Sequence, residues 1–113
     1  MLPETTFDEF AKSDIRVGRI VAAELFPEGR ASTHVLEIDL GDELGRRKSL
    51  ARLAPNYGYE ELTGRQVLCL VNLPERQIGK HRSQVLTLGV PDAEGRVGLI
   101  VPDTEVPLGG RLY

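Results

Sequence analysis

The chain has 113 residues, of which 41% are hydrophobic, and a net charge of −3 at pH 7. This length supports one hydrophobic core, so we expect a single domain over residues 1–113. No apolar run approaches the length that crosses a bilayer, and the N-terminus lacks the basic and apolar segments of a secretory signal. We therefore expect a cytoplasmic protein without membrane insertion. The one cysteine, Cys69, lies in an apolar run and is predicted to be a buried small residue rather than a nucleophile.

Positive charge is concentrated in one part of the sequence. Residues 46–82 contain eight Lys or Arg residues and three acidic ones, a balance of +5 that leaves −8 for the remainder. Salt screens charges beyond about 10 Å, so a basic surface can bind phosphate on a protein that is acidic overall. A solvated surface with ordinary charge scatter is the alternative.

The first part of the chain predicts a short helix and then two strands. Thr6 and Glu9 have the spacing of a capping box, and the helix that they begin carries Phe7 and Phe10 on one face. Residues 15–25 alternate as a long half-buried strand does, with Gly18 where a bend or bulge is expected. The inward face should hold Ile15, Val17, Val21, Ala23 and Leu25. After a turn at 27–30, a strand at 34–40 should place His34, Leu36, Ile38 and Leu40 inside, with Val35, Glu37 and Asp39 outside.

A third strand is predicted over residues 46–53, with strongly different faces. Its small residues Ser49 and Ala51 suit a crowded barrel interior, whereas Lys48 and Arg52 should be neighbouring cations outside. Residues 54–64 form a connector with at most one helical turn at 59–62.

Residues 66–90 organise the rest of the chain. The run 67–71 is short, apolar and rich in strand formers, which predicts a strand covered on both faces. A second strand is expected at 84–89. Between them lie Pro74, which removes a backbone donor, and Gly79, which permits a sharp turn. We expect this short, stiff connection to present a cluster of cationic residues: Arg76, Lys80, His81 and Arg82.

This order of elements predicts an all-β fold, and a five-stranded Greek-key barrel of the OB type accounts for it, although other small barrels remain alternatives. Residues 1–14 would be a helical extension, 15–90 the barrel and 91–113 a C-terminal strand extension used for dimerisation. The extensions carry more apolar surface than a small barrel can cover, so we expect a second copy of the chain to cover it. The predicted dimer interface contains Phe7, Phe10, Val97, Leu99 and Val101.

Three segments resemble the tRNA-binding domain found at the C-terminus of some methionyl-tRNA synthetases and in EMAP-type factors. They are residues 15–21 (IRVGRIV), 57–64 (YGYEELTG) and 71–83 (VNLPERQIGKHRS). The compact length, the ending 83–89 (SQVLTLG) and the 99–108 tail are most similar to the CsaA subfamily, which consists of homodimeric export-related chaperones also associated with tRNA.

The resemblance implies a two-fold dimer of OB barrels with an RNA-facing side at the third strand and the 76–83 connection. Asn72, Arg76 and Ser83 match the family's motif, and Glu75 replaces a second proline, which puts an anion beside Arg76. The expected RNA-binding residues are Lys48, Ser49, Arg52, Asn72, Arg76, Lys80, Arg82 and Ser83. The implied partners are tRNA or another structured RNA, unfolded preprotein segments and the export machinery.

Each of these residues also has a purely structural interpretation. Asn72 could hydrogen-bond its own turn, Ser83 could satisfy backbone groups of the next strand, and Arg76 could pair with a neighbouring carboxylate. His34, His81 and Cys69 lie too far apart in the sequence to favour zinc, and no catalytic or cofactor-binding motif occurs, so we expect neither an enzyme nor a cofactor.

Six Phe and Tyr residues and no Trp disfavour a surface that stacks base after base, and favour folded RNA recognised by backbone and shape. Two functional hypotheses remain. One is a tRNA-binding module acting with the translation machinery; the other is a chaperone that also binds tRNA.

Overall fold

The computed structural model describes residues 1–26 and 34–113 of the chain. In chain order the elements are α1 (Phe7–Ala11), β1 (Ile15–Leu25), β2 (His34–Asp39), β3 (Arg46–Ala51), α2 (Tyr59–Leu62), β4 (Gln66–Leu70), β5 (Arg76–Ile78), β6 (His81–Ser83), β7 (Leu86–Thr87), β8 (Gly89–Pro91) and β9 (Val97–Leu99). The turn expected at 27–30 lies outside the described residues.

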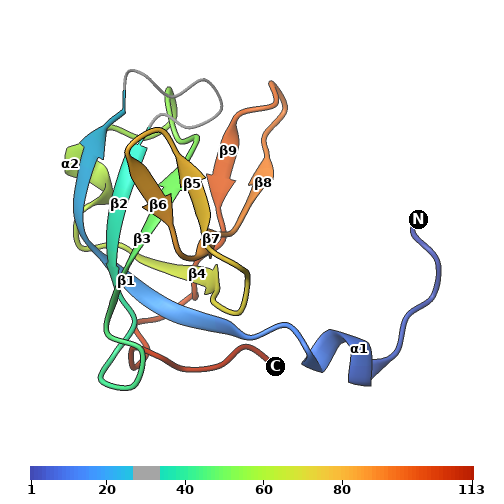
Figure 1. The fold of residues 1–113 in the computed structure, drawn as a ribbon. Helices are drawn as coiled ribbons and strands as arrows, with labels where there is room; N and C mark the ends of the chain where they lie inside the picture. The colour runs from blue at the N-terminus through green and yellow to red at the C-terminus, as the bar shows by residue number, and fades with distance from the viewer. Residues whose placement is uncertain (27–33) are drawn as a thin grey trace.

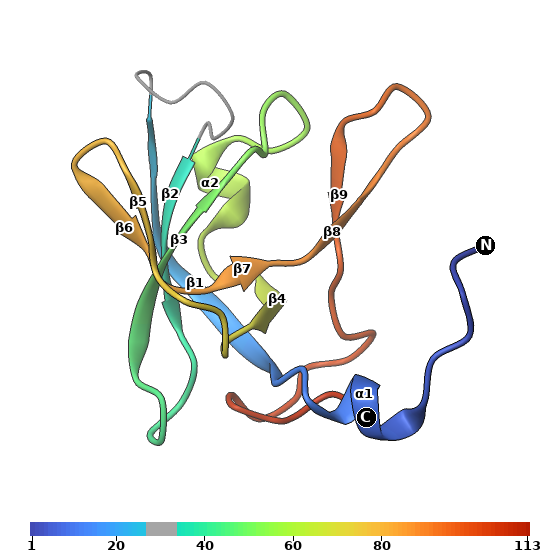
Figure 2. The same ribbon diagram turned by 45° about the vertical axis from the view of Figure 1, so that its right-hand side comes forward.

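Five antiparallel strands form a nearly closed barrel in the order β3-β2-β1-β4-β7, and two hairpins, β5–β6 and β8–β9, project from it (Figure 1). Figure 2 shows the two hairpins on opposite sides of the barrel. This arrangement confirms the all-β, OB-type prediction, and α2 forms at the predicted helical turn.

The main core fills the barrel and is covered at one end by α2. Its buried residues are Ile20, Leu36, Ile38, Leu40, Leu53, Leu62, Val67, Cys69 and Val85. In β4 the residues Gln66 to Cys69 are all buried, so this strand is covered on both faces as its continuous apolar run predicts. At about 25 cal/mol per Å² of apolar area removed from water, this core is the main stabilising term of the fold.

The predicted inward face of β1 is only partly right, because a β-bulge shifts the register between Ile20 and Ala22. Val17 is buried as predicted. Ile20 is fully buried and only Ala23 of the later residues packs against the core, whereas Leu25 is exposed. A bulge places two residues opposite one, which reverses the alternation of faces. Gly18 permits close packing instead of a bend, because a Cβ there would lie 2.4 Å from Cγ2 of Ile38.

A second apolar cluster lies on the outer face of β2 and β3, beneath the β5–β6 hairpin. Phe26, Val35 and Leu50 are buried there, with Ile78 of the hairpin packed against them. The rings of Phe26 and His81 meet edge to face with centroids 5.1 Å apart. Val35 was expected outside, but the hairpin removes it from water.

The barrel closes between β3 and β7 through side chains. Ser49 and Thr87 hydrogen-bond through their hydroxyl groups at 2.8 Å. The strand predicted at 84–89 is therefore only partly formed: β7 has two residues, and Gly89 already begins the β8–β9 hairpin.

The C-terminal tail pairs with β1 of its own protomer. The amide of Val17 donates to the carbonyl of Gly110 at 2.9 Å, and the amide of Leu112 donates to that of Ile15 at 2.8 Å. Val97 and Leu99 are half-buried against the main core, so they are less available to a second copy than the sequence suggested.

Helix α1 stands away from the barrel in Figures 1 and 2 and buries none of its residues. Thr6 caps it by accepting a hydrogen bond from the amide of Glu9, as predicted, while the Glu9 carboxylate pairs with Lys12. Phe7 is 72% exposed and contacts Phe10. The helix therefore presents an apolar pair to its surroundings.

Candidate nucleic-acid interface

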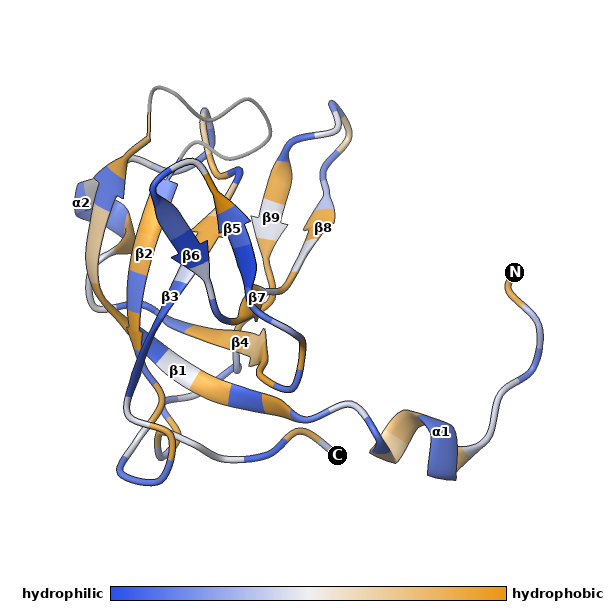
Figure 3. Ribbon diagram, in the orientation of Figure 1, coloured by the Kyte–Doolittle hydropathy of each residue, from blue (hydrophilic) through white to orange (hydrophobic). Residues whose placement is uncertain are grey.

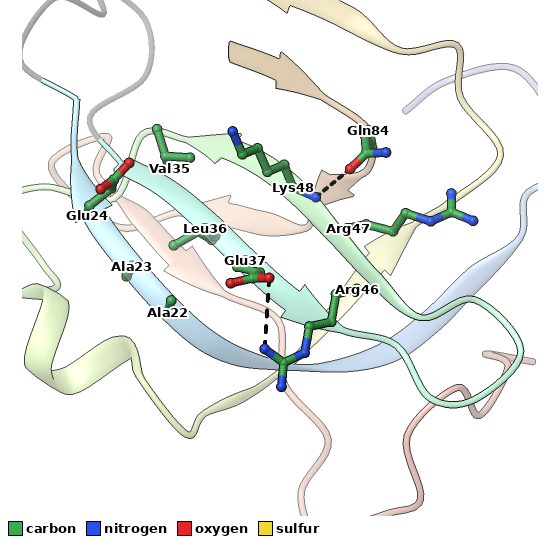
Figure 4. A pocket seen from close by; sticks show the side chains of 10 residues that line it. All are labelled: Ala22, Ala23, Glu24, Val35, Leu36, Glu37, Arg46, Arg47, Lys48 and Gln84. Atoms are coloured by element: carbon green, nitrogen blue, oxygen red, sulfur yellow. Dashed lines mark hydrogen bonds and ion pairs between the residues drawn. The ribbon is translucent and has the colours of Figure 1, made fainter.

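The candidate site consists of the outer face of β2 and β3 together with the β5–β6 hairpin, and we call it the basic face. The hairpin and the first part of β3 are largely hydrophilic, in contrast to the apolar β4 (Figure 3). Beside the hairpin lies an open hollow of about 440 Å³, whose residues are drawn in Figure 4: Ala22, Ala23, Glu24, Val35, Leu36, Glu37, Arg46, Arg47, Lys48 and Gln84.

Hydrogen bonds fix the hairpin and the residues directly after it to the open edge of β3. The side chain of Gln84 accepts from the amide of Lys48 at 2.8 Å, and the amide of Gln84 donates to the Lys48 carbonyl at 2.8 Å. The hydroxyl of Ser83 accepts from the amide of Leu50 at 3.1 Å. A strand edge presents unpaired backbone groups. These contacts give the edge groups of β3 the hydrogen-bond partners that a neighbouring strand would otherwise supply.

These contacts bring cations from two segments together. Nζ of Lys48 lies 3.3 Å from Nδ1 of His81. In the hairpin register Arg76 is opposite Ser83 and Gln77 is opposite Arg82. Gly79 has a φ of +59° in the turn, and Lys80 follows it. A left-handed φ suits glycine, so the tight turn that presents Lys80 depends on Gly79.

Most of the predicted cations have no carboxylate partner. Among the ion pairs of residues 1–26 and 34–113, none involves Lys48, Arg52, Arg76 or Lys80.

Glu75 was expected to offset Arg76, but it pairs with Arg82 at 3.2 Å and accepts from Gln84 at 3.3 Å. Its hydrogen bonds from Arg82 and then Gln84 hold the pKa of the Glu75 carboxyl below its usual value. Glu75 therefore offsets part of the charge of Arg82, and among the described residues Arg76 has no ion pair.

Three predicted contact residues have internal roles instead. Ser49 is fully buried in the bond that closes the barrel, so we leave it out of the contact surface. Asn72 does not serve its own turn: its side chain accepts from the amide of Asp14 at 3.0 Å and donates to the carbonyl of Lys12 at 2.6 Å, which fixes the end of α1. Ser83 satisfies backbone groups, as its structural interpretation holds.

Arg52 does not line the same hollow as Lys48. It lines a different hollow, of about 330 Å³, against the β8–β9 hairpin, beside Leu86, Val90 and Val97. The expected pair of neighbouring cations on β3 is instead Arg46 and Lys48, which both line the hollow beside the hairpin. The run of three cations at 46–48 is the signal in the sequence that identifies Arg46, which the predicted contact set omitted.

The chemistry of the remaining polar groups does not indicate catalysis. Burial raises the pKa of the Cys69 thiol to about 11, so the thiolate that a nucleophile requires is scarce near neutral pH. Within residues 1–26 and 34–113, no three His, Cys, Asp or Glu side chains converge as metal ligands. Nor does any helix in this part of the chain have the length and apolar character needed to cross a membrane.

This geometry defines a small OB-type module with a basic face, and comparisons with known proteins identify its family. Residues 15–111 match the model described as "Putative tRNA binding domain". The chain is therefore a member of the tRNA-binding domain family.

Two groups of relatives are informative. The chain is 41% identical over 107 residues to a methionine–tRNA ligase of Thermococcus kodakarensis, covering 95% of this chain but 14% of that enzyme. It thus spans about one seventh of the curated relatives that it matches.

Solved structures of similar length also align closely. The chaperone CsaA of Bacillus anthracis str. Ames aligns with a TM-score of 0.86 and 38% identity, covering 98% of this chain and all of that one. The CsaA chaperone of Picrophilus torridus aligns with a TM-score of 0.88 and 35% identity, covering 97% of this chain and 100% of that one. A methionyl-tRNA-synthetase-related protein of Pyrococcus horikoshii aligns at 0.86 with 28% identity, covering 99% and 100% of the two chains.

The structural role of Ser83 gives a first prediction. Ser83→Ala removes the acceptor of the Leu50 amide, and the side chain of Leu50 is buried. The free energy of unfolding should therefore fall by about 1–3 kcal/mol in urea titrations. The neighbouring change Arg82→Gln removes an exposed ion pair and should change the free energy of unfolding by less than about 0.5 kcal/mol. Equal stability of Ser83→Ala and the parent chain would contradict this role.

Proposed function

We propose that the chain binds folded RNA, tRNA above all, through the basic face. The observation that carries this proposal is the convergence of cations from β3 and the β5–β6 hairpin, held together by the Gln84 and Ser83 bonds to β3. The proposed phosphate contacts are Arg46, Lys48, Arg76, Lys80 and Arg82, with Arg52 as an outlying one. Asn72 and Ser83 support this surface by positioning α1 and the hairpin.

The binding mode follows from the kind of groups that the face presents. Arg and Lys side chains fix a nucleic-acid backbone, and their contacts carry no sequence information directly. His81 already packs edge to face on Phe26, so this ring is engaged within the protein. We therefore assign most of the binding free energy to phosphate contacts and to the shape of the RNA.

We further propose that the working unit is a homodimer. Phe7 and Phe10 project on a helix without a buried residue, and Val101 is also exposed. Exposed apolar surface of this kind is normally covered by a partner, and a second copy does so with two-fold symmetry. Val97 and Leu99 would contribute less, since they are half-buried within the protomer.

A second candidate function is chaperone activity on unfolded preprotein segments, with a link to the export machinery. A groove of about 290 Å³ lies beside the basic face, and its apolar lining includes Leu50, Leu73, Pro74, Ile78, Val85 and Leu86. Leu73 and Leu86 are both exposed. Two similar structures over their full length are titled CsaA chaperones, which supports this candidate. In both candidates the protein acts by binding, without catalysis, in the cytoplasm.

The RNA proposal predicts a steep dependence on salt. Each phosphate contact contributes a slope of roughly 0.7 to 0.9 in a plot of log K against log salt. Neutralising two contacts, Arg76→Gln with Lys80→Gln, should therefore flatten the slope for tRNA by about 1.4 to 1.8 units, measured by filter binding. A control with the same charge change outside the basic face, Lys12→Gln with Arg96→Gln, should leave the slope unchanged. An unaltered slope in the first variant would place the RNA site elsewhere.

The dimer proposal predicts that Phe7→Ser with Phe10→Ser yields a folded monomer. Because α1 buries no residue in the protomer, the change should leave the protomer's circular dichroism native while light scattering reports half the mass. The exposed Leu25→Ser, at the far end of β1, serves as the matched control and should remain dimeric. The proposal would be contradicted if the parent chain were monomeric at about 100 micromolar, which is on the order of ordinary working concentrations.

The two candidate functions predict opposite responses to ionic strength. Extended peptides bind grooves through main-chain hydrogen bonds and apolar pockets, which depend weakly on salt. An unfolded client should therefore remain bound as salt rises, should survive the Arg76 and Lys80 changes, and should be lost with Leu73→Asp. Full displacement of a labelled peptide at one tRNA per dimer would instead indicate one shared electrostatic surface and would contradict a separate client site.

A further inference from the structure

The basic face contains a carboxylate that phosphate binding does not explain. Glu37 lies at the centre of β2, opposite Ala22 of β1 and Lys48 of β3. An anion here repels the phosphates that the surrounding cations attract, so it weakens a surface that recognises only the RNA backbone. A ligand that brings hydrogen-bond donors as well as phosphates would give this carboxylate a role.

The cations near Glu37 do not neutralise it by a close pair. Lys48 directs Nζ to His81 at 3.3 Å, away from its cross-strand neighbour. The sole ion pair of Glu37 among the described residues is to Arg46, with N and O 3.9 Å apart, beyond hydrogen-bond distance. The Glu37 carboxylate is half-exposed at the hollow and retains its acceptor capacity (Figure 4).

The hollow beside Glu37 has an apolar floor and a polar rim. The small side chain of Ala22 lines the β1 side, Glu24 and Glu37 supply carboxylates, and Arg46 and Lys48 supply cations. Its volume of about 440 Å³ lies in the range of small-molecule sites. A flat heterocycle can lie on such small apolar side chains, and an exposed guanidinium such as that of Arg46 can stack on its face.

Among the four RNA bases, guanine complements a carboxylate best. Its Watson–Crick edge presents two adjacent donors, N1–H and the N2 amino group, which match the two oxygens of one carboxylate. Adenine and cytosine each place a ring-nitrogen acceptor beside their single amino group, and uracil places carbonyls on both sides of its one N–H. A carboxylate, which only accepts, is repelled by these acceptors.

We infer that the hollow binds one unpaired guanine of the RNA, with Glu37 accepting from N1–H and N2–H and the Arg46 guanidinium against the base. This inference rests on the proposed function and deepens it, because it adds one base-specific contact to a surface that otherwise holds phosphates. Lys48 and the hairpin cations hold the phosphates on either side of the base.

The test compares guanosine with inosine, which lacks the N2 amino group. Uridine hexamers with one central guanosine, inosine, adenosine or cytidine are titrated at low salt by fluorescence anisotropy. Guanosine should bind roughly tenfold more tightly than inosine, since a bidentate pair to a base is worth about 1–3 kcal/mol of discrimination. In Glu37→Gln this ratio should fall below about twofold, while binding of the all-uridine hexamer stays the same or improves. Glu60→Gln, an equal charge change on the exposed side of α2, should retain the ratio.

A second measurement separates this inference from the proposed function. Guanosine monophosphate should shift the backbone amide resonances of Ala22, Ala23 and Glu37 more than inosine monophosphate does. Normal tRNA binding with equal guanosine and inosine affinities would overturn the guanine site alone. Absence of binding to tRNA and to every hexamer would overturn the proposed function, and the mononucleotide titration would then decide the guanine site by itself.

Discussion

The open edge of β3 is the constraint on which the rest of the structure depends. An antiparallel barrel of five strands must close between β3 and β7, yet β7 has only two residues. Side chains and backbone amides complete the closure: Ser49 bonds Thr87 in the interior, while Ser83 and Gln84 bond the β3 backbone. Because Ser83 ends β6 and Gln84 follows it directly, closing the barrel also fixes the β5–β6 hairpin against β3.

Fixing the hairpin has consequences for packing and for charge. It covers the outer face of β2 and β3, so Val35 and Leu50 become a second small core with Phe26. It also brings the hairpin cations to the cations of residues 46–48, although the two segments are some thirty residues apart. Salt screens charge beyond about 10 Å, so this local concentration matters more to a polyanion than the net charge of −3.

The sequence predicts the barrel well wherever periodicity and turn chemistry agree. The continuous apolar run of β4 and the helical turn of α2 appear where they were expected, because each is determined by local pattern. The predicted face of β1 omitted the buried Ile20 and included the exposed Leu25, since a bulge depends on the partner strand and leaves no periodic signal. Val35 was misplaced for a similar reason: alternation identifies its face but not the hairpin that covers that face.

Prediction of the site was limited in the same way. Residue type identified the cations, but only the three-dimensional structure shows that Lys48 lies opposite Glu37 and directs its amine to His81 of the hairpin. The matched motif residues Asn72 and Ser83 hydrogen-bond backbone amides, so a motif indicates a surface without saying which members touch the ligand.

The position of α1 connects this surface to assembly. A helix of five residues is unstable alone, and here it is held by its Thr6 cap, by Asn72 and by the bond from Arg111 to the carbonyl of Ala11 at 2.5 Å. These polar contacts orient the helix but bury neither of its phenylalanines. Covering this apolar face with another surface would therefore stabilise the helix. If that surface is a second copy, the same two-fold axis duplicates the basic face. One folded RNA that reaches both faces then binds the second as an intramolecular step, which raises affinity without any new kind of contact. In such a dimer, assembly rather than more charge would offset the small size of the basic face on an acidic chain.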